Sequence, residues 1–267
     1  MTDPRFMRFA ATSLSNSAAA SMSAARSPSV SGRSKKPGGH SPACLSRASP
    51  HAFRTNRALT HASLVEGAHA LAAQDRSLAR IVDRLGVPPL WARRPGFATL
   101  IRIILEQQVS LAAARTLYRR LHGALGGMTP GIVNACGEAR LRELGLTRQK
   151  AHYCHGLAAR VLNGSLDLSA AAALPDADGR ARLLSVPGLG SWSVDIYYLM
   201  ALRRPDVWPE GDMALATALR EVQCLRALPS REQQRIIASR WSPWRSVAAR
   251  LLWAHYLAER GQYTPEG

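Results

Sequence analysis

Cysteine is scarce in this 267-residue sequence, and its spacing argues against the common cysteine-based sites. No two of the four cysteines form a Cys-x-x-Cys pair, so neither a zinc site nor an iron–sulfur cluster is expected. Isolated, buried thiols in a reducing compartment are expected at Cys44, Cys136, Cys154 and Cys224. Long apolar runs are also missing, and no stretch approaches the length of a membrane-spanning helix.

Acidic residues are few: 18 Asp and Glu stand against 35 Lys and Arg, which gives a formal net charge of +17. Such an excess favours a polyanionic partner, with nucleic acid as the first candidate and an anionic membrane surface as the second. The imbalance is greatest in residues 1–60, where Asp3 is the only acid beside nine Arg and Lys. This segment has little apolar periodicity, so we predict a disordered basic tail that adds nonspecific phosphate affinity. A transit peptide and a misassigned start codon are open alternatives.

Alternating strand patterns do not recur, and from residue 61 onward the apolar residues follow a helical period. We therefore predict one all-α domain over residues 61–267, with about ten helices. The stretches "TPGIVNAC" and "EARLRELG" are interpreted as two separate helices, and "SWSVDIYYLMALRR" as one. Local capping and stop signals place helix ends at Gly86, Ser110, Thr129, Thr147 and Gly164.

One short stretch, "VPGLG", separates two helical segments by a tight turn. Pro187 ends the first helix, while Gly188 and Gly190 permit a positive φ or a close backbone approach. The second helix is expected to begin near Ser191, where free N–H groups and the helix dipole favour an anion. This geometry would grip a nucleic-acid phosphate without reading sequence. A plain helix–turn–helix corner is the alternative interpretation.

The same turn suggests a minor second role. Backbone carbonyls in such a hairpin are able to hold a monovalent Na⁺ or K⁺. The candidate carbonyls belong to Leu184, Val186 and Leu189. We expect no other cofactor or metal, because the histidines show no ligand spacing with partners.

Together, the "VPGLG" hairpin, the Gly/Pro-rich turn "WPEGD" and the Asp that ends it resemble the helix–hairpin–helix DNA glycosylase superfamily. Three further stretches resemble its alkylbase branch, the 3-methyladenine DNA glycosylase II type: "ILEQQVSLAAA", "LGLTRQKAHY" and "RWSPWRSVAARLLW". The resemblance implies an all-α fold of two helical lobes with the active-site cleft between them. It implies a monofunctional enzyme that flips and hydrolytically excises alkylated purines of the 3-methyladenine and 7-methylguanine type.

Trp192 occupies the position where bifunctional relatives carry a lysine, so the resemblance implies no Schiff-base nucleophile and no lyase step. The resemblance also implies double-stranded damaged DNA as the partner, a monomer, and a cytoplasmic, nucleoid-associated place of bacterial type. A non-catalytic DNA-binding protein and a glycosylase for deaminated or mismatched bases are the competing hypotheses. The preferred lesion among alkylpurines, hypoxanthine and etheno adducts stays open.

Base excision breaks an N-glycosidic bond while positive charge builds on the sugar, so a carboxylate is needed close to C1′. Asp212 is the candidate, because it lies 20 residues after Trp192, the spacing that the family uses. "GDMAL" fits equally well as an ordinary helix N-cap, so sequence alone leaves both interpretations of Asp212. Asp206 and Glu210 are expected to be solvated turn residues.

The resemblance also indicates which side chains surround the base. Trp192 and Trp253 match pocket aromatics, although core packing is the common fate of a helical tryptophan. Ile196 stands where the branch often has a further aromatic, and Gln107 would line the pocket. Gln108 would enter the duplex as the wedge that replaces the flipped base.

Two basic side chains complete the predicted interface. Lys150, the only lysine after residue 36, is expected to contact a phosphate beside Thr147 at a helix start. A solvated helix face is the ordinary alternative for that lysine. Arg245 is expected either to contact a phosphate or to brace the pocket.

Overall fold

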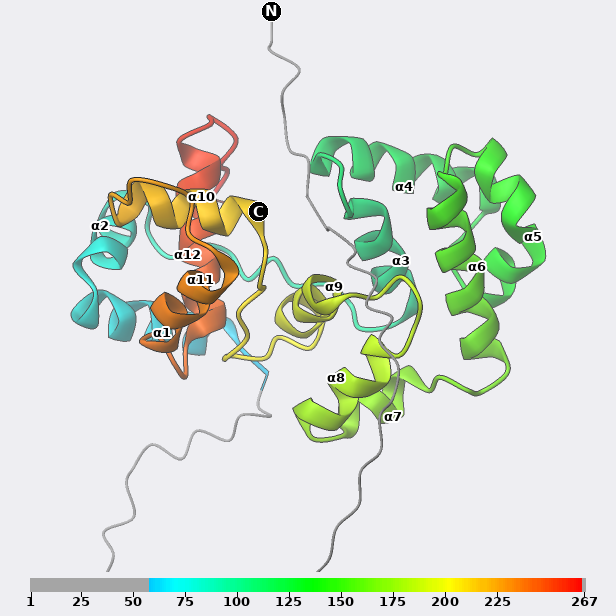
Figure 1. The fold of residues 1–267 in the computed structure, drawn as a ribbon, viewed down its shortest axis with the longest axis horizontal. Helices are drawn as coiled ribbons and strands as arrows, with labels where there is room; N and C mark the ends of the chain where they lie inside the picture. The colour runs from blue at the N-terminus through cyan, green and yellow to red at the C-terminus, as the bar shows by residue number, and fades with distance from the viewer. Residues whose placement is uncertain (1–57, 266–267) are drawn as a thin grey trace, which may run out of the picture. The chain divides into compact units, whose positions relative to one another are not determined.

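The computed structural model describes residues 58–265, and within this range the chain forms twelve α-helices, one π-helix and no strand (Figure 1). The predicted basic tail falls almost wholly outside the described residues. None of the described helices is long and apolar enough to cross a membrane. The elements are α1 His61–Gln74, α2 Arg76–Leu85, α3 Phe97–Glu106, α4 Leu111–Leu125, α5 Pro130–Glu143, α6 Arg148–Leu162, α7 Leu168–Ala173, α8 Asp176–Leu184, α9 Ser191–Ile196, η1 Tyr197–Ala201, α10 Met213–Val222, α11 Arg231–Ser239 and α12 Arg245–Ala258.

Local chemistry sets most helix ends where the sequence predicts them. The side chains of Ser110, Thr129 and Thr147 each accept a backbone N–H in the first turn of α4, α5 and α6. Gly86 ends α2 with φ 72°, and Gly164 follows α6 with φ 76°, a conformation that suits a residue without Cβ. These five predicted ends are confirmed.

The described residues hold more helices than the predicted ten, because short elements such as α7 and η1 add to the count although two predicted helices join in α5. α5 contains Gly137 at φ 71° and ψ 163°, so its two halves are the two predicted helices. The stretch expected as one helix from Ser191 changes to a π-helix at Tyr197, where Leu202 N–H donates to the Tyr197 carbonyl at 3.1 Å. The π turn leaves both Tyr197 and Tyr198 buried.

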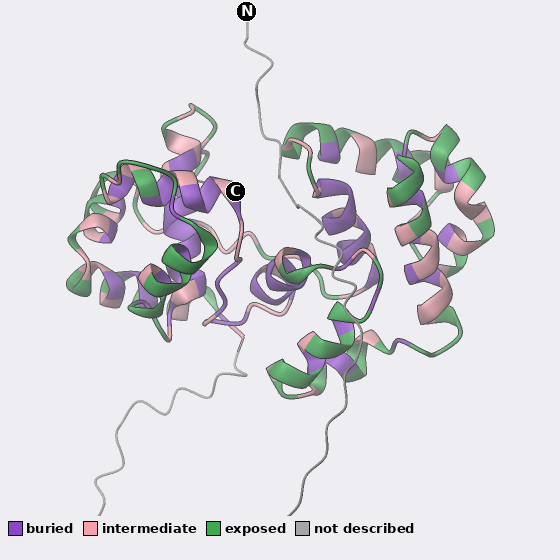
Figure 2. Cartoon of the chain, in the orientation of Figure 1, coloured by how far each residue is buried: buried purple, intermediate pink, exposed green. Residues whose placement is uncertain are grey.

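Helix contacts divide the described residues into two groups, as the two-lobed prediction requires. In one, α12 packs against α1, α2, α10 and α11. In the other, α3 packs against α4, α6, α9 and η1, while α5 joins α6 and α7 joins α8. Figure 2 shows that most residues of α3, α9 and α12 are buried, and these helices supply the core from which the site is built.

Candidate active site

Asp212 is almost completely buried, with 3% of its surface exposed, at the residue before α10. The "WPEGD" turn brings it there, with Gly211 at φ 80° and the Asp212 N–H donating to the Pro209 carbonyl at 3.3 Å. Its Oδ1 accepts the Leu215 N–H at 2.9 Å. Asp212 is therefore the N-cap of α10, and the same geometry holds its carboxylate at the positive end of the helix dipole.

Two tryptophans from different helices donate to this one carboxylate. The Trp192 Nε1–H of α9 donates to Oδ2 at 2.9 Å, and the Trp253 Nε1–H of α12 donates to Oδ1 at 3.3 Å. Trp192 is half-buried and Trp253 is buried. The structure thus brings together Asp212 and both predicted pocket tryptophans, which lie 20 and 41 positions from it in the chain.

Two opposing effects act on the carboxyl group. Burial raises the pKa of Asp212 above its ordinary value, because water no longer solvates the charge. Hydrogen bonds from the Trp192 indole, the Leu215 N–H and the Trp253 indole favour the charged form and lower the pKa. Burial dominates, so the pKa of Asp212 stays raised and the carboxylate is less hydrated than a surface Asp.

The hairpin has the glycine chemistry that the sequence suggests, with one refinement. Gly188 adopts φ 91°, and a Cβ there would lie 2.4 Å from the Tyr153 ring. Gly190 has φ −81°, and a Cβ there would meet nothing within 4 Å. Only Gly188 is therefore required by the fold. At Gly190 and Ser191, both exposed, the absence of a neighbouring atom leaves the start of α9 open to a ligand.

Gln107 and Gln108 lie at the end of α3, against this hairpin. The Gln107 Nε2 donates to the Gly188 carbonyl and to the Ser193 Oγ, each at 2.8 Å. Gln108 is exposed and adopts φ 58°, which is uncommon for a residue with a Cβ. Gln107 therefore connects α3 to the hairpin, while Gln108 stays exposed in the turn that follows.

Lys150 makes contacts that the sequence did not predict. Its Nζ donates to the Leu105 carbonyl at 2.7 Å and to the Gln107 carbonyl at 2.8 Å. Partial burial lowers the pKa of this ammonium. The side chain is thus turned toward the end of α3, and its expected contact with a phosphate stays a prediction. Thr147 is exposed, and its hydroxyl oxygen caps α6 through the Lys150 N–H.

Arg245 pairs with Asp206 at the start of α12. Its Nε and Nη2 donate to the two carboxylate oxygens of Asp206 at 2.7 and 2.9 Å. Ser242 also donates to Asp206, and these hydrogen bonds hold the pKa of Asp206 below its ordinary value. The prediction that Asp206 is a solvated turn residue is therefore wrong, because it ties the start of α12 to the loop before Asp212. Glu210 is half-buried in that loop.

Sequence reasoning missed a second buried acid beside the site. Asp195 of α9 is 2% exposed and pairs with Arg180 of α8. Burial, only partly offset by Arg180, raises the pKa of Asp195 to about 6. Its Oδ2 also accepts the Glu210 N–H at 3.4 Å. The signal was weak, since one Asp among "SWSVDIYY" looks like any helix residue, and only the fold reveals its partners.

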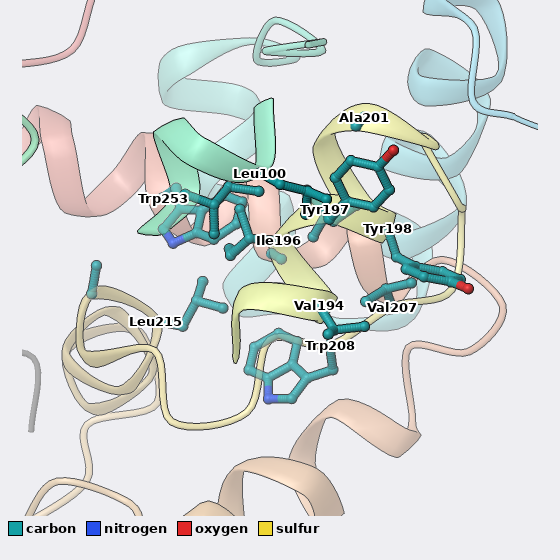
Figure 3. Packing of buried hydrophobic residues seen from close by; sticks show 14 of the residues in the cluster. Leu100, Val194, Ile196, Tyr197, Tyr198, Ala201, Val207, Trp208, Leu215 and Trp253 are labelled. Atoms are coloured by element: carbon teal, nitrogen blue, oxygen red, sulfur yellow. The ribbon is translucent and has the colours of Figure 1, made fainter. Parts of the chain in front are cut away.

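The remaining predicted residues lie as follows. Ile196 is 3% exposed, and Figure 3 shows it and Trp253 within the same group of buried side chains. Among the hairpin carbonyls, that of Val186 accepts the Leu189 N–H at 3.0 Å. Cys154 is buried as expected, but Cys136 is half-buried and Cys224 is exposed. No group of three or more His, Cys, Asp or Glu within residues 58–265 is arranged to hold a metal ion.

Comparison with known protein families points to the superfamily that the sequence motifs resemble. The profile of the HhH-GPD superfamily base excision DNA repair proteins matches residues 101–243, which include the hairpin and Asp212. A putative DNA-3-methyladenine glycosylase of Bacillus subtilis is 26% identical over 66% of this chain and 64% of its own length. A probable bifunctional transcriptional activator/DNA repair enzyme of Mycobacterium tuberculosis is 30% identical over 62% of this chain and 34% of its own length. The chain therefore spans less than two thirds of these relatives.

Solved structures agree on the fold. A Schizosaccharomyces pombe 3-methyladenine DNA glycosylase in complex with abasic DNA superposes with a TM-score of 0.68 at 23% identity, covering 74% of this chain and 99% of that one. A DNA-3-methyladenine glycosidase of Bacillus halodurans gives 0.60 at 24% identity, covering 74% and 92%. The two-group helical arrangement is thus the fold that these proteins share.

Proposed function

Because the chain belongs to the HhH-GPD superfamily of base excision DNA repair proteins, we propose that it is a monofunctional DNA glycosylase. Its substrate would be double-stranded DNA that carries alkylated purines of the 3-methyladenine and 7-methylguanine type. The observation that carries the proposal is the buried Asp212 carboxylate, held by indole N–H groups from two helices. The relatives named as 3-methyladenine glycosylases support the choice of alkylated bases.

The excision step needs a negative charge close to C1′ of the sugar. When the N-glycosidic bond breaks, its electron pair leaves with the base and C1′ of the sugar becomes positive. An alkylated purine is already cationic, so it leaves as a neutral base without prior protonation. Asp212, poorly hydrated and fixed by Leu215 and Trp192, would stabilise the sugar cation and accept a proton from the water that adds to C1′.

Recognition of the flipped base rests on the two indoles. Both indole N–H groups are directed to Asp212, which fixes the orientation of the rings. Trp192 is half-buried, and a cationic purine is attracted to an indole ring by stacking and cation–π interaction. Gln107 and Ile196 would shape the rest of the pocket.

We propose that the hairpin binds the DNA backbone. Gly190 and Ser191 are exposed at the start of α9, where free N–H groups suit a phosphate. Gly188 shapes the turn, and Thr147 lies exposed at the start of α6. Carbonyls of Leu184, Val186 and Leu189 remain the proposed ligands of a monovalent cation in the hairpin.

The available amines support the proposal of hydrolysis without strand cleavage. A lyase needs a lysine that attacks C1′, but position 192 is a tryptophan. Lys150 is the only lysine within residues 58–265, and its Nζ donates to two α3 carbonyls. We further propose that the protein is a monomer. Its place would be a cytoplasm of bacterial type, in association with the nucleoid.

The decisive experiment replaces Asp212 by Asn and measures release of free 3-methyladenine and 7-methylguanine from methylated duplex DNA. We expect the wild type to release both bases and Asp212→Asn to be slower by about 100-fold or more, since one charge-stabilising group is lost. Asn also caps helices, so the fold should persist.

Asp167→Asn is the matched control, because Asp167 is likewise the N-cap of a helix, α7, but lies exposed. Its release rate should equal that of the wild type. Wild-type release from Asp212→Asn would contradict the proposed role. Salt-sensitive DNA binding without any release by the wild type would favour a non-catalytic DNA-binding protein or another lesion class, tested next on inosine- and uracil-containing DNA.

A further inference from the structure

The turn that ends α3 carries Gln107 and Gln108, and its backbone is held from two sides. On one side, the Lys150 ammonium bridges the Leu105 and Gln107 carbonyls at 2.7 and 2.8 Å. On the other, the Gln107 amide donates to the Gly188 carbonyl and to Ser193 Oγ. One residue therefore receives contacts from α6 through its carbonyl and gives contacts to the hairpin through its side chain.

The Lys150 contact is chemically specific to a helix end. The last carbonyls of a helix have no N–H partner within it, and the helix dipole makes this end negative. An ammonium with three donors is well suited to bind two such carbonyls at once. The lowered pKa of Lys150 agrees with an amine withdrawn from water into this contact.

The Lys150 contact lies next to an unusual backbone conformation. Gln108, the residue directly after the clamped carbonyl, is exposed at φ 58°. A residue with a Cβ in this conformation is strained and keeps it only when its surroundings impose it. A side chain that fills a gap in a base stack must enter at a fixed offset from the phosphates that the protein grips. The two sets of contacts together fix that offset, because Lys150 holds the Gln108 turn to α6 and the Gln107 side chain joins the same turn to the hairpin.

We propose that Lys150 is a positioning residue: its ammonium locks the end of α3 so that Gln108 is held ready to enter the DNA stack. This inference rests on the proposed function. The cost of losing Lys150 would fall on wedge insertion and on the excision rate, while the affinity for DNA would be largely kept. A phosphate-binding lysine would show the opposite pattern.

The test uses the full chain and duplex DNA with a stable tetrahydrofuran abasic site flanked by 2-aminopurine, whose fluorescence rises when stacking is disturbed. Lys150→Met is expected to bind this DNA within about 3-fold of the wild-type Kd, since phosphate contacts dominate affinity. Its fluorescence rise should be largely lost, and its single-turnover excision of methylated bases should fall by about 10-fold or more. Lys150→Arg, which keeps charge and donors, should recover part of both signals.

Arg148→Met is the charge-matched control, from the first turn of the same helix. Arg148 is exposed, and no hydrogen bond of its side chain is found within residues 58–265. Its fluorescence rise and single-turnover rate should stay at the wild-type level, so a loss confined to Lys150→Met cannot come from charge alone. If Lys150→Met folds too poorly to assay, Gln107→Met removes the clamp from the hairpin side and should lose the fluorescence rise in the same way.

The outcomes separate the two proposals. A wild-type fluorescence rise that Lys150→Met retains in full would overturn the positioning role, whatever the excision result. If Lys150→Met mainly raises the Kd and shows the wild-type fluorescence rise at saturation, the positioning role is overturned in favour of a phosphate contact. Absence of base release by the wild type, with the fluorescence difference present, would overturn the glycosylase proposal but support the positioning role. No fluorescence rise in the wild type would overturn the positioning role.

Discussion

At the scale of single residues, Asp212 has two roles that its sequence context presented as alternatives. Its Oδ1 caps α10 through the Leu215 N–H, while Oδ2 accepts the Trp192 indole. The "GDMAL" pattern predicts the cap correctly, because capping depends on neighbours in the chain. The indole contacts come from other helices, so no local pattern was able to reveal them.

The Trp192 indole gives a prediction about pH. Its hydrogen bond is the largest of the contacts that lower the pKa of Asp212 against the effect of burial. Trp192→Phe keeps an aromatic ring but removes the donor, so the pKa of Asp212 should rise further. If ionised Asp212 is required, activity is lost as pH falls through this pKa, and the acid limb of the single-turnover pH–rate profile should move to higher pH.

Trp253→Phe supplies the comparison for that profile. Its hydrogen bond to Asp212 is longer, at 3.3 Å, and its effect on the pKa is smaller than that of Trp192. The shift should therefore have the same direction and a smaller size. An acid limb that does not move in Trp192→Phe, or that moves to lower pH, would contradict the role assigned to the indole.

At the scale of elements, the hairpin is the part of the site that the sequence describes best. A Pro-Gly-x-Gly turn between helices is a local motif, and its consequences follow from backbone sterics alone. Its partners are another matter. The contacts that Gln107 and Lys150 make with the hairpin and with α3 join residues 43 to 86 positions apart. The carbonyl partners of Lys150 were not predicted from the sequence for this reason.

The two hairpin glycines should respond differently to alanine. Gly188→Ala places a Cβ at φ 91° and against Tyr153, so it should destabilise the fold by about 1–3 kcal/mol. Gly190→Ala meets no neighbour, so its unfolding free energy should stay within about 0.5 kcal/mol of wild type. Urea denaturation measures both values.

For DNA binding, we expect the variant that leaves stability unchanged, Gly190→Ala, to have a clear effect. A methyl group at Gly190 stands where a phosphate would approach, so Gly190→Ala should weaken binding to duplex DNA and reduce its dependence on salt. A titration at several salt concentrations measures this effect on a variant that is fully folded. Unchanged affinity would mean that the opening at Gly190 does not accommodate the DNA backbone.

At the scale of the whole molecule, one buried arginine ties the two groups of helices together. Arg250 of α12 has no exposed surface, and it donates to the carbonyls of Leu90, Leu199 and Ser246 at 2.8 to 2.9 Å. Leu199 belongs to η1 in the other group, so the guanidinium spans the junction near which Asp212 meets Trp192. Burial lowers the pKa of Arg250 to about 9.

Arg250→Met should therefore destabilise the protein strongly. The aliphatic side chain fills much of the volume but removes the hydrogen bonds that the carbonyls of Leu90, Leu199 and Ser246 accept from the guanidinium. A buried polar group that is left without a partner costs about 1–3 kcal/mol. We expect a loss of at least about 3 kcal/mol by urea denaturation, with part of it recovered in Arg250→Lys. A change below about 0.5 kcal/mol would show that the carbonyls find other partners.

Sequence predicted the class of the whole fold because helical periodicity and capping are local. The family resemblance also named Asp212, Trp192 and Trp253 as one group, and the structure brings these three side chains together. Ion pairs such as Arg245–Asp206 and Asp195–Arg180 were missed, since charged residues in a basic chain look solvated until the fold brings their partners together. The division into two groups of helices came from the resemblance, and helix contacts confirm it.

The π turn at Tyr197–Ala201 has a consequence for comparing this chain with others. A regular α-helix turns by about 100° per residue, and a π turn accommodates one more residue before its hydrogen bond closes. An alignment built on helical period alone would therefore place every residue beyond Tyr197 one position out of phase. Deleting a single residue from this segment would restore the regular period, and with it turn Arg204 and the loop that leads to Asp212 toward a different face.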